Sequence, residues 1–159
     1  MKTIVVYYSL DGNCDFIAQN IKQRLNCDLL RLNTKKRLKS AGILKFFWAG
    51  KQVVTGEKPE LETYTFDASA YDLIIFGTPV WAWHYAPALR TFFENNKFSG
   101  RKIALFCCHG GQPGTTLKKL RLNLEGNQII GEIDFQEPLK TGREAAQKKL
   151  NEWLARIIK

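Results

Sequence analysis

The chain has 159 residues, of which 45% are hydrophobic and 12% aromatic, a composition that excludes a disordered protein and suffices for the core of one domain. Its apolar runs are strand-sized and well short of the roughly 20 residues of a membrane span, so we expect none. The 24 Lys and Arg exceed the 15 Asp and Glu and give a net charge of +9, which bears on partners rather than on the fold.

The first half of the chain alternates β-rich and helical segments. Thr3–Ser9 reads TIVVYYS and predicts a strand; we take it as the start of a cytoplasmic protein because the segment lacks a signal-peptide cleavage site. Gly12–Leu25 predicts an amphipathic helix, and Cys27–Leu32 predicts a short second strand. Lys35–Thr55 has apolar residues at three-to-four spacing and predicts a basic amphipathic helix. Gly56–Thr65 then reads as a loop.

The second half continues the alternation. Tyr71–Gly77 is a continuous apolar run, typical of a central strand that is covered on both faces. The remaining predicted elements are strands at Lys102–Cys108 and Gln128–Phe135 and helices at Pro87–Asn95, Thr115–Leu124 and Gly142–Ile158. Alternating strands and helices predict an α/β fold in one domain over residues 1–159: three layers, with a doubly wound, five-stranded parallel sheet.

Doubly wound sheets bind ligands beyond the carboxyl ends of their strands, and there the first connection offers an anion site. Ser9-Leu10-Asp11-Gly12-Asn13-Cys14 lies between a strand and a helix and supplies N–H groups, a hydroxyl and a helix dipole. The loop is neither a Walker motif nor GxGxxG, which disfavours nucleoside triphosphates and dinucleotides. A turn that simply caps the helix is the alternative.

Two further connections should meet this loop. The second one, residues 78–85, carries Trp81, Trp83 and Tyr85, and exposed aromatic rings at a strand end suit a planar aromatic ligand. The alternative for Trp83 is that it fastens the loop to a helix. In the third connection, small residues after His109 would let the backbone pass along a ring edge.

These three loops, in this order, resemble those of the flavodoxin family of FMN-binding proteins over essentially the whole chain. That family's first loop reads Ser/Thr-x-Thr/Ser-Gly-x-Thr, which Ser9, Gly12 and Asn13 match. The resemblance implies a strand order of 2-1-3-4-5, a short-chain type, and FMN with its ring beside Trp81. The implied cofactor-binding residues are Ser9, Leu10, Asp11, Gly12, Asn13, Cys14, Thr78, Pro79, Val80, Trp81, Ala82, Trp83, Cys108, His109, Gly110 and Gly111.

The sequence departs from the family pattern at three places. Asp11 stands where the family has a hydroxyl donor, and Cys14 stands where it has threonine. An ionised carboxylate about 4 Å from a phosphate charge repels it by roughly 1–4 kcal/mol, so we expect Asp11→Thr to tighten FMN. The second loop lacks the glycine that eases a peptide flip in the family, and a positive φ at Ala82 would cost about 1 kcal/mol. Strong stabilisation of a neutral semiquinone is therefore not expected, and hydride-like two-electron chemistry is an option.

Other candidate groups have two interpretations each. His84 and His109 are proton donors near the flavin or ordinary loop residues. Cys107 and Cys108 fill a strand end or form a redox disulfide, and reduced thiols are our expectation for all four cysteines. No spacing predicts a metal site or a catalytic cluster.

The positive charge bears on partners. Arg31–Lys58 holds eight Lys and Arg against one acid, Glu57, which is either a solvated face or a patch that steers an acidic redox partner protein. Neither a nucleic-acid motif nor basic residues interleaved with aromatic ones are present, so we expect no nucleic-acid binding.

The sequence supports three functions. The first is an FMN-dependent electron carrier. The second is an NAD(P)H-dependent FMN or quinone-type reductase on the same fold. The third, suggested by Asp11, is a binding or scaffolding module with weak or lost flavin affinity.

Overall fold

The computed structural model describes residues 1–36, 50, 51, 53 and 55–158. Its strands are β1 (Thr3–Tyr7), β2 (Asp28–Arg31), β3 (Leu73–Trp81), β4 (His84–Tyr85), β5 (Lys102–His109) and β6 (Gln128–Gln136). Its helices are α1 (Asn13–Leu25), α3 (Pro87–Asn95), α4 (Thr116–Asn123), α5 (Pro138–Thr141) and α6 (Arg143–Ile157), with a 3₁₀ turn at Ala68–Ala70.

The five long strands form one parallel sheet in the order β2-β1-β3-β5-β6. With β4 set aside, this is the predicted order 2-1-3-4-5, and the predicted doubly wound α/β fold is confirmed. The register places Val5 of β1 between Leu29 of β2 and Ile75 of β3. The two-residue strand β4 pairs antiparallel with the end of β3.

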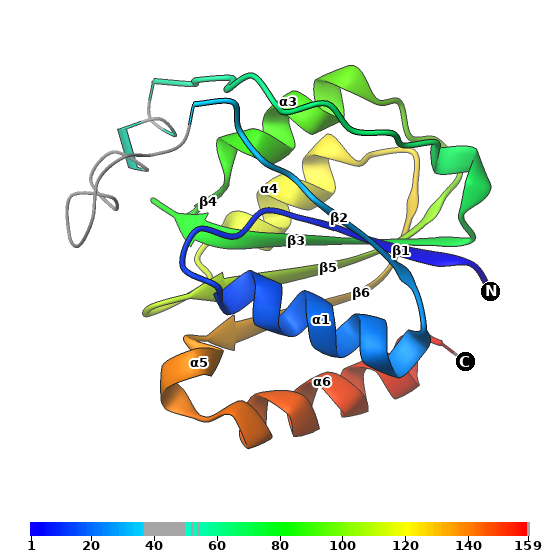
Figure 1. The fold of residues 1–159 in the computed structure, drawn as a ribbon, viewed down its shortest axis with the longest axis vertical. Coiled ribbons are helices and arrows are strands. Elements are labelled where there is room, and N and C mark those ends of the chain that lie inside the picture. Colours follow the sequence, from blue (N-terminus) through cyan, green and yellow to red (C-terminus); the bar gives the residue numbers. More distant parts are fainter. Residues whose placement is uncertain (37–49, 52, 54, 159) are drawn as a thin grey trace.

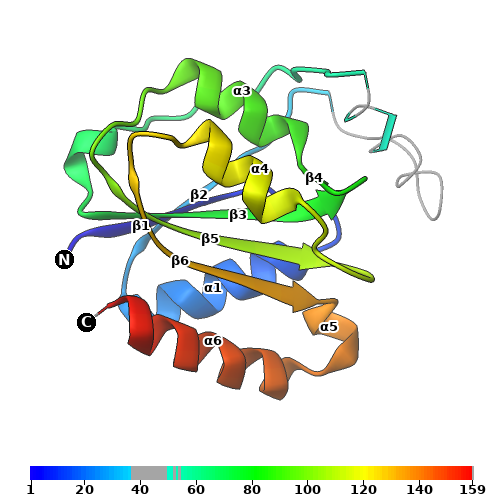
Figure 2. The same ribbon diagram turned by 180° about the vertical axis from the view of Figure 1, so that it is seen from behind.

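Helices cover both faces of the sheet (Figures 1 and 2): α1, α5 and α6 lie on one face, and α3 and α4 lie on the other. Successive residues of a strand point to opposite faces. Val5 and Ile75 accordingly pack with α1 and α6, whereas Val6 and Phe76 pack with α3 and α4. This two-sided burial explains why the central strands read as continuous apolar runs.

The helices form where the apolar spacing predicts them. In α1 the buried residues Ile17, Ala18 and Ile21 share one face, and Asn26 ends the helix in a left-handed conformation with φ 48°. The bounds of α3 are those predicted. Pro87 occupies its first turn, where a missing N–H costs nothing.

The structure corrects the second connection. Residues 78–81, predicted as loop, extend β3, and Val80 and Trp81 pair with Tyr85 and His84 in a hairpin. Pro79 misled the prediction, because proline is rare inside a sheet. Beyond Gly77 the strand has lost its neighbour β1 and continues beside β5, and a strand paired on fewer sides tolerates proline.

The short helix α5 was not predicted, because a helix of four residues is too short to show an apolar period in the sequence. The helix predicted over Lys35–Thr55 falls mostly on residues outside those described. Among the described residues, no helix has the length and apolar character needed to cross a bilayer.

Candidate functional site

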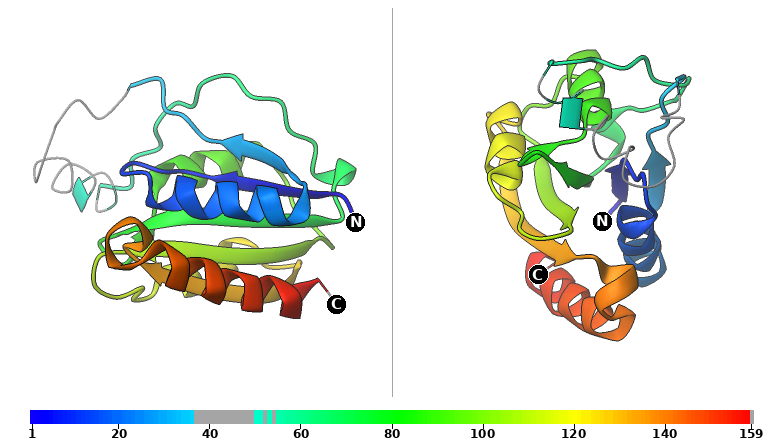
Figure 3. Two further views of the ribbon diagram at one scale, coloured as in Figure 1. Left: turned by 60° about the horizontal axis from the view of Figure 1, so that its bottom comes forward. Right: turned by 90° about the vertical axis from the view of Figure 1, so that its left-hand side faces the viewer.

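The carboxyl ends of β1, β3, β5 and β6 lie at one edge of the sheet, and the chain termini lie at the opposite edge (Figures 1 and 3). The connections at the carboxyl edge surround a cleft of about 190 Å³. Its lining residues are Leu10, Asp11, Asn13, Pro79, Val80, Trp81, Cys108, His109, Gly110 and Glu137. All but Glu137 are among the predicted cofactor-binding residues. The other predicted residues, which do not line the cleft, are Ser9, Gly12, Cys14, Thr78, Ala82, Trp83 and Gly111.

The first loop turns sharply into α1. Gly12 has φ 91°, a conformation that favours glycine, and a Cβ there would lie 3.3 Å from Cδ1 of Leu139. The buried Ser9 hydroxyl accepts a hydrogen bond from the backbone N–H of Asp15, at 3.2 Å. The serine thus stabilises the start of the helix, which is the capping role that the sequence left open.

The side chain of Asp11 is hydrogen-bonded to one of the backbone amides of this loop. Its Oδ1 accepts a hydrogen bond from the backbone N–H of Asn13, at 3.1 Å. The N–H groups of Leu10, Asp11, Gly12 and Cys14 donate to no protein group within the described ranges. Successive free amides at the start of a helix are a favourable environment for an anion, although the Asp11 carboxylate opposes a second negative charge.

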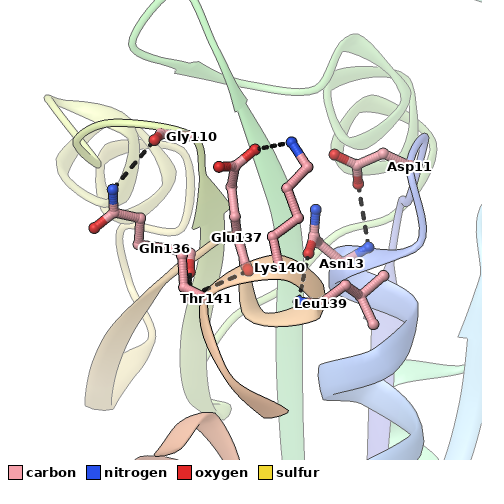
Figure 4. A network of polar contacts seen from close by, with 8 residues as sticks. All are labelled: Asp11, Asn13, Gly110, Gln136, Glu137, Leu139, Lys140 and Thr141. Carbon is pink, nitrogen blue, oxygen red and sulfur yellow. Dashed lines mark hydrogen bonds and ion pairs between the residues drawn. The ribbon is translucent and has the colours of Figure 1, made fainter.

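The connection after β6 adds Glu137 to the lining of the cleft, and Figure 4 shows the polar contacts of this connection. The backbone N–H of Leu139 donates to Oδ1 of Asn13 at 3.1 Å, which fastens α5 to the first loop. The backbone N–H of Glu137 donates to the carbonyl of His109 at 2.9 Å, and its carboxylate pairs with Nζ of Lys140 at 2.6 Å. Glu137, Leu139 and Lys140 are not among the residues predicted from the sequence, whereas Asn13 and His109 are. The signal was available, since Glu137 directly follows a parallel strand, as the other loops do.

The β3–β4 hairpin forms one wall of the cleft. Trp81 is 5% exposed and packs edge-on against Tyr8, with ring centroids 5.5 Å apart. The two turn residues, Ala82 and Trp83, have φ of 49° and 58°, as type I′ hairpin turns require. The positive φ at Ala82, considered as a cost from the sequence, is therefore already present.

Trp83 is 67% exposed, unlike the other two tryptophans that the structure describes. Its ring lies so close to Gly114 that a Cβ on that glycine would come within 2.6 Å of Cδ1. The hydroxyl of Thr115 donates to the carbonyl of Trp83 at 3.0 Å. These contacts fasten the hairpin to the segment before α4, which was the alternative interpretation of Trp83.

His109 lies at the end of β5 with its side chain almost fully buried. Its Nε2 is 2.9 Å from the Asp134 carboxylate, and its Nδ1 is buried without a partner in the described part of the chain. Although burial opposes ionisation of Asp134, the bond to His109 and the charge of Lys149 hold its pKa below the ordinary value. In the neutral ring, Nε2 carries the proton toward Asp134 and Nδ1 is a free acceptor.

His84, Cys14 and Cys107 are poor proton donors and nucleophiles at neutral pH. Burial lowers the pKa of His84, and the charges of Lys119 and Arg90 lower it further, so the ring is neutral at pH 7. Burial raises the pKa of Cys14 and Cys107 well above the ordinary thiol value, and the neighbouring thiol of Cys108 raises both further. All four cysteines are free thiols, and the protonated thiols of Cys14 and Cys107 react slowly.

Comparisons with known proteins give a family and a fold. A family model described as Flavodoxin matches residues 2–157. An FMN complex of a flavoprotein from Lactobacillus acidophilus is 22% identical, with a TM-score of 0.74 over 96% of this chain and 97% of that one. Two-electron reduced flavodoxin from Megasphaera elsdenii is 21% identical, with a TM-score of 0.64 over 96% and 98%.

A more distant likeness is to general stress protein 14 of Treponema denticola in complex with FMN. It is 12% identical, with a TM-score of 0.60 over 99% of this chain and 98% of that one. No curated protein sequence matches the chain significantly. At these identities, the solved structures establish the fold alone.

Proposed function

Because this chain belongs to the flavodoxin family, we propose that it binds FMN non-covalently at the cleft and transfers electrons through it. The observation that carries this proposal is the row of free backbone amides in the first loop, beside a cleft walled by an aromatic hairpin. The amides of Leu10, Asp11, Gly12 and Cys14 suit the phosphate. The end of β3 and Cys108–Gly110 lie where the ring would be held.

The chain's part in this function is to bind and to orient. The bound flavin supplies the electron transfer. Trp81 offers an indole at the wall of the cleft, and Nδ1 of His109 is a buried polar atom with no partner among the described residues. At about 190 Å³ the cleft is smaller than the roughly 300 Å³ of small ligand pockets. A cleft of this size would leave part of a bound flavin accessible to a redox partner.

Two of the similar structures support the cofactor. The Lactobacillus acidophilus flavoprotein and the Treponema denticola stress protein were both solved with FMN. Their folds extend over nearly all of this chain, so a cleft at the same strand ends is an expected consequence of common architecture.

The redox partner in this proposal is a protein with an acidic docking face. The hairpin presents the exposed Trp83, and the charges of Arg90 and Lys119 lie near enough to His84 to lower its pKa. With a net charge of +9, the molecule attracts acidic proteins over long distances. The rate of electron exchange with such a partner should fall as ionic strength rises.

A second candidate function is a binding module with little flavin affinity. The observation that favours it is the pair of carboxylates, Asp11 and Glu137, that line the cleft. Two negative charges beside a phosphate oppose its binding. Under this alternative the fold is retained and the loops bind a partner instead of a cofactor.

Purification in the absence of added flavin separates the two candidates. We expect a yellow protein whose flavin is released by denaturation and identified by chromatography as FMN. If the protein is colourless, titration with FMN should quench flavin fluorescence with saturable stoichiometry. A colourless chain that leaves free FMN fluorescence unchanged overturns the flavin proposal and favours the binding module.

Anaerobic titration of the flavin-loaded protein then separates a carrier from a reductase. A carrier is reduced slowly by NADH and NADPH and rapidly by a partner reductase. Rapid bleaching of the flavin by either nicotinamide nucleotide alone would contradict the carrier function and support the reductase.

A further inference from the structure

A lysine that the sequence did not predict as a site residue, Lys140, lies at the carboxyl edge of the sheet. Lys140 lies on α5, and its Nζ is 2.6 Å from Oε1 of Glu137. Glu137 and Asp11 both line the cleft. In Figure 4 the Lys140 ammonium lies between the Glu137 and Asp11 carboxylates. The hydrogen bond and the charge of Glu137, and to a lesser extent the charge of Asp11, raise the pKa of Lys140. The side chain therefore keeps its positive charge at neutral pH.

The position of Lys140 is set by contacts between segments far apart in the chain. The hydrogen bond from the N–H of Leu139 to Asn13 joins α5 to the first loop across 126 residues. Leu139 also packs 3.3 Å from where a Cβ of Gly12 would lie. The backbone beneath Lys140 is therefore fixed against the loop, whereas the side chain is 73% exposed and free to change its partner.

The charges at this edge require such a cation. Asp11 and Glu137 contribute two negative charges, and a phosphate monoester adds about two more near neutral pH. Arg31 is another described cation near the first loop. It donates to the carbonyl of Ser9 and pairs with Asp15, and neither of these residues lines the cleft.

We infer that Lys140 is the cation that binds the phosphate of the flavin, and that it exchanges its partner Glu137 for that phosphate when the cofactor enters. This inference rests on the proposed function and identifies a specificity residue of the same site. Glu137 holds the ammonium near the loop in the absence of ligand and competes with the phosphate for it. The expected result is a preference for FMN over riboflavin that depends on Lys140.

The test compares the dissociation constants of FMN and riboflavin by fluorescence titration. Lys140→Met should weaken FMN about fivefold to tenfold, as expected for one charge-assisted hydrogen bond at an exposed site. Riboflavin has no phosphate, so its affinity should not change. Lys148→Met removes an exposed lysine of α6, the helix that follows α5, and it should leave both affinities as they are.

Further variants separate charge from structure. Lys140→Arg should keep most of the preference for FMN, because the charge is retained. Glu137→Gln should strengthen FMN binding, since it releases the ammonium and removes a negative charge. Raising the ionic strength should reduce the FMN preference of the wild type more than that of Lys140→Met.

The outcomes distinguish this inference from the proposed function. If the wild type binds neither flavin, the proposed function fails and the assignment of Lys140 fails with it. If the wild type binds FMN and Lys140→Met changes both flavins equally or neither, FMN binding stands and the assignment of Lys140 is overturned.

Discussion

Asp11 is the residue at which this chain departs most from what a phosphate requires. Its carboxylate accepts the N–H of Asn13, so it both fills a donor that an anion would use and places a charge beside the anion. Cys14 is a smaller departure, because its backbone N–H is free of protein partners among the described residues. Of these two departures, Asp11 is therefore the one that we expect to weaken phosphate binding at the proposed site.

Replacement of Asp11 tests this dependence. Asp11→Thr should strengthen FMN binding by about tenfold, because a repulsion of roughly 1–4 kcal/mol is removed and a hydroxyl donor is gained. Asp11→Asn keeps an acceptor for the Asn13 amide and removes only the charge, so its effect should be intermediate. Riboflavin affinity serves as the control. An FMN dissociation constant that is unchanged or higher in Asp11→Thr would contradict this interpretation.

At the scale of elements, the path from β3 to α3 depends on one buried hydroxyl. Thr78 is fully buried; its Oγ1 accepts the backbone N–H of Ala86 at 2.9 Å and donates to the carbonyl of Pro79 at 2.9 Å. The bond between Ala86 and Thr78 holds the residue before α3 against the end of β3. The hairpin between them is thereby kept at the wall of the cleft.

Replacing threonine by valine, which has nearly the same shape, at two positions measures how much the hydrogen bond between Thr78 and Ala86 contributes to stability. Thr78→Val should lower the free energy of unfolding by about 1–3 kcal/mol, since the buried N–H of Ala86 loses its acceptor. Thr116→Val is the matched control. Thr116 is equally buried, but its hydroxyl has no partner among the described residues, so valine should be neutral or stabilising. Equal losses in urea unfolding would show that the bond contributes little.

The hairpin turn itself is strained, because two residues other than glycine have positive φ. Ala82→Gly should raise the free energy of unfolding by up to about 1 kcal/mol, since glycine adopts φ 49° without a steric cost. Ala145→Gly, at an exposed position of α6, should lower it by about 0.5–1 kcal/mol. A loss of stability in both variants would mean that the turn relaxes its strain elsewhere.

At the scale of the whole molecule, buried cysteine and tyrosine side chains with raised pKa values should make the protein less stable at alkaline pH. Burial raises the pKa of Cys27 from 9.0 to about 11, and burial likewise raises the pKa of Tyr8 and Tyr85. The unfolded chain loses these protons first. Their contribution to stability is complete below the unfolded pKa and is lost as the pH rises through the folded one.

Urea unfolding between pH 7 and pH 11 should therefore show stability that falls from about pH 9 upward. Cys27→Ala should lower stability throughout, because it removes buried atoms, but its curve should fall less steeply between about pH 9 and pH 11. If the two curves run parallel in that window, Cys27 does not contribute to the alkaline loss.

The sequence by itself determined the order of the elements and the sheet. The continuous apolar runs at Leu73–Phe76 and Ile103–Phe106 specify strands buried on both faces, and the 3.6-residue period in α1 and α6 specifies the covering helices. Because parallel strands present their carboxyl ends at one edge, the sequence also predicted which loops converge there. All three predicted segments contribute residues to the cleft, although residues 78–81 do so as the end of β3 and not as a loop.

The tertiary structure decided what those loops do to one another. A turn motif does not reveal that Asp11 holds the amide of Asn13, that Asn13 is fastened to Leu139, or that Lys140 lies against Glu137 beside the cleft. The bond between Asn13 and Leu139 joins residues 126 positions apart, and it depends on the twist and register of the sheet. Local periodicity specifies which face of an element is buried, whereas charge placement at a cleft depends on distances that only the packed chain fixes.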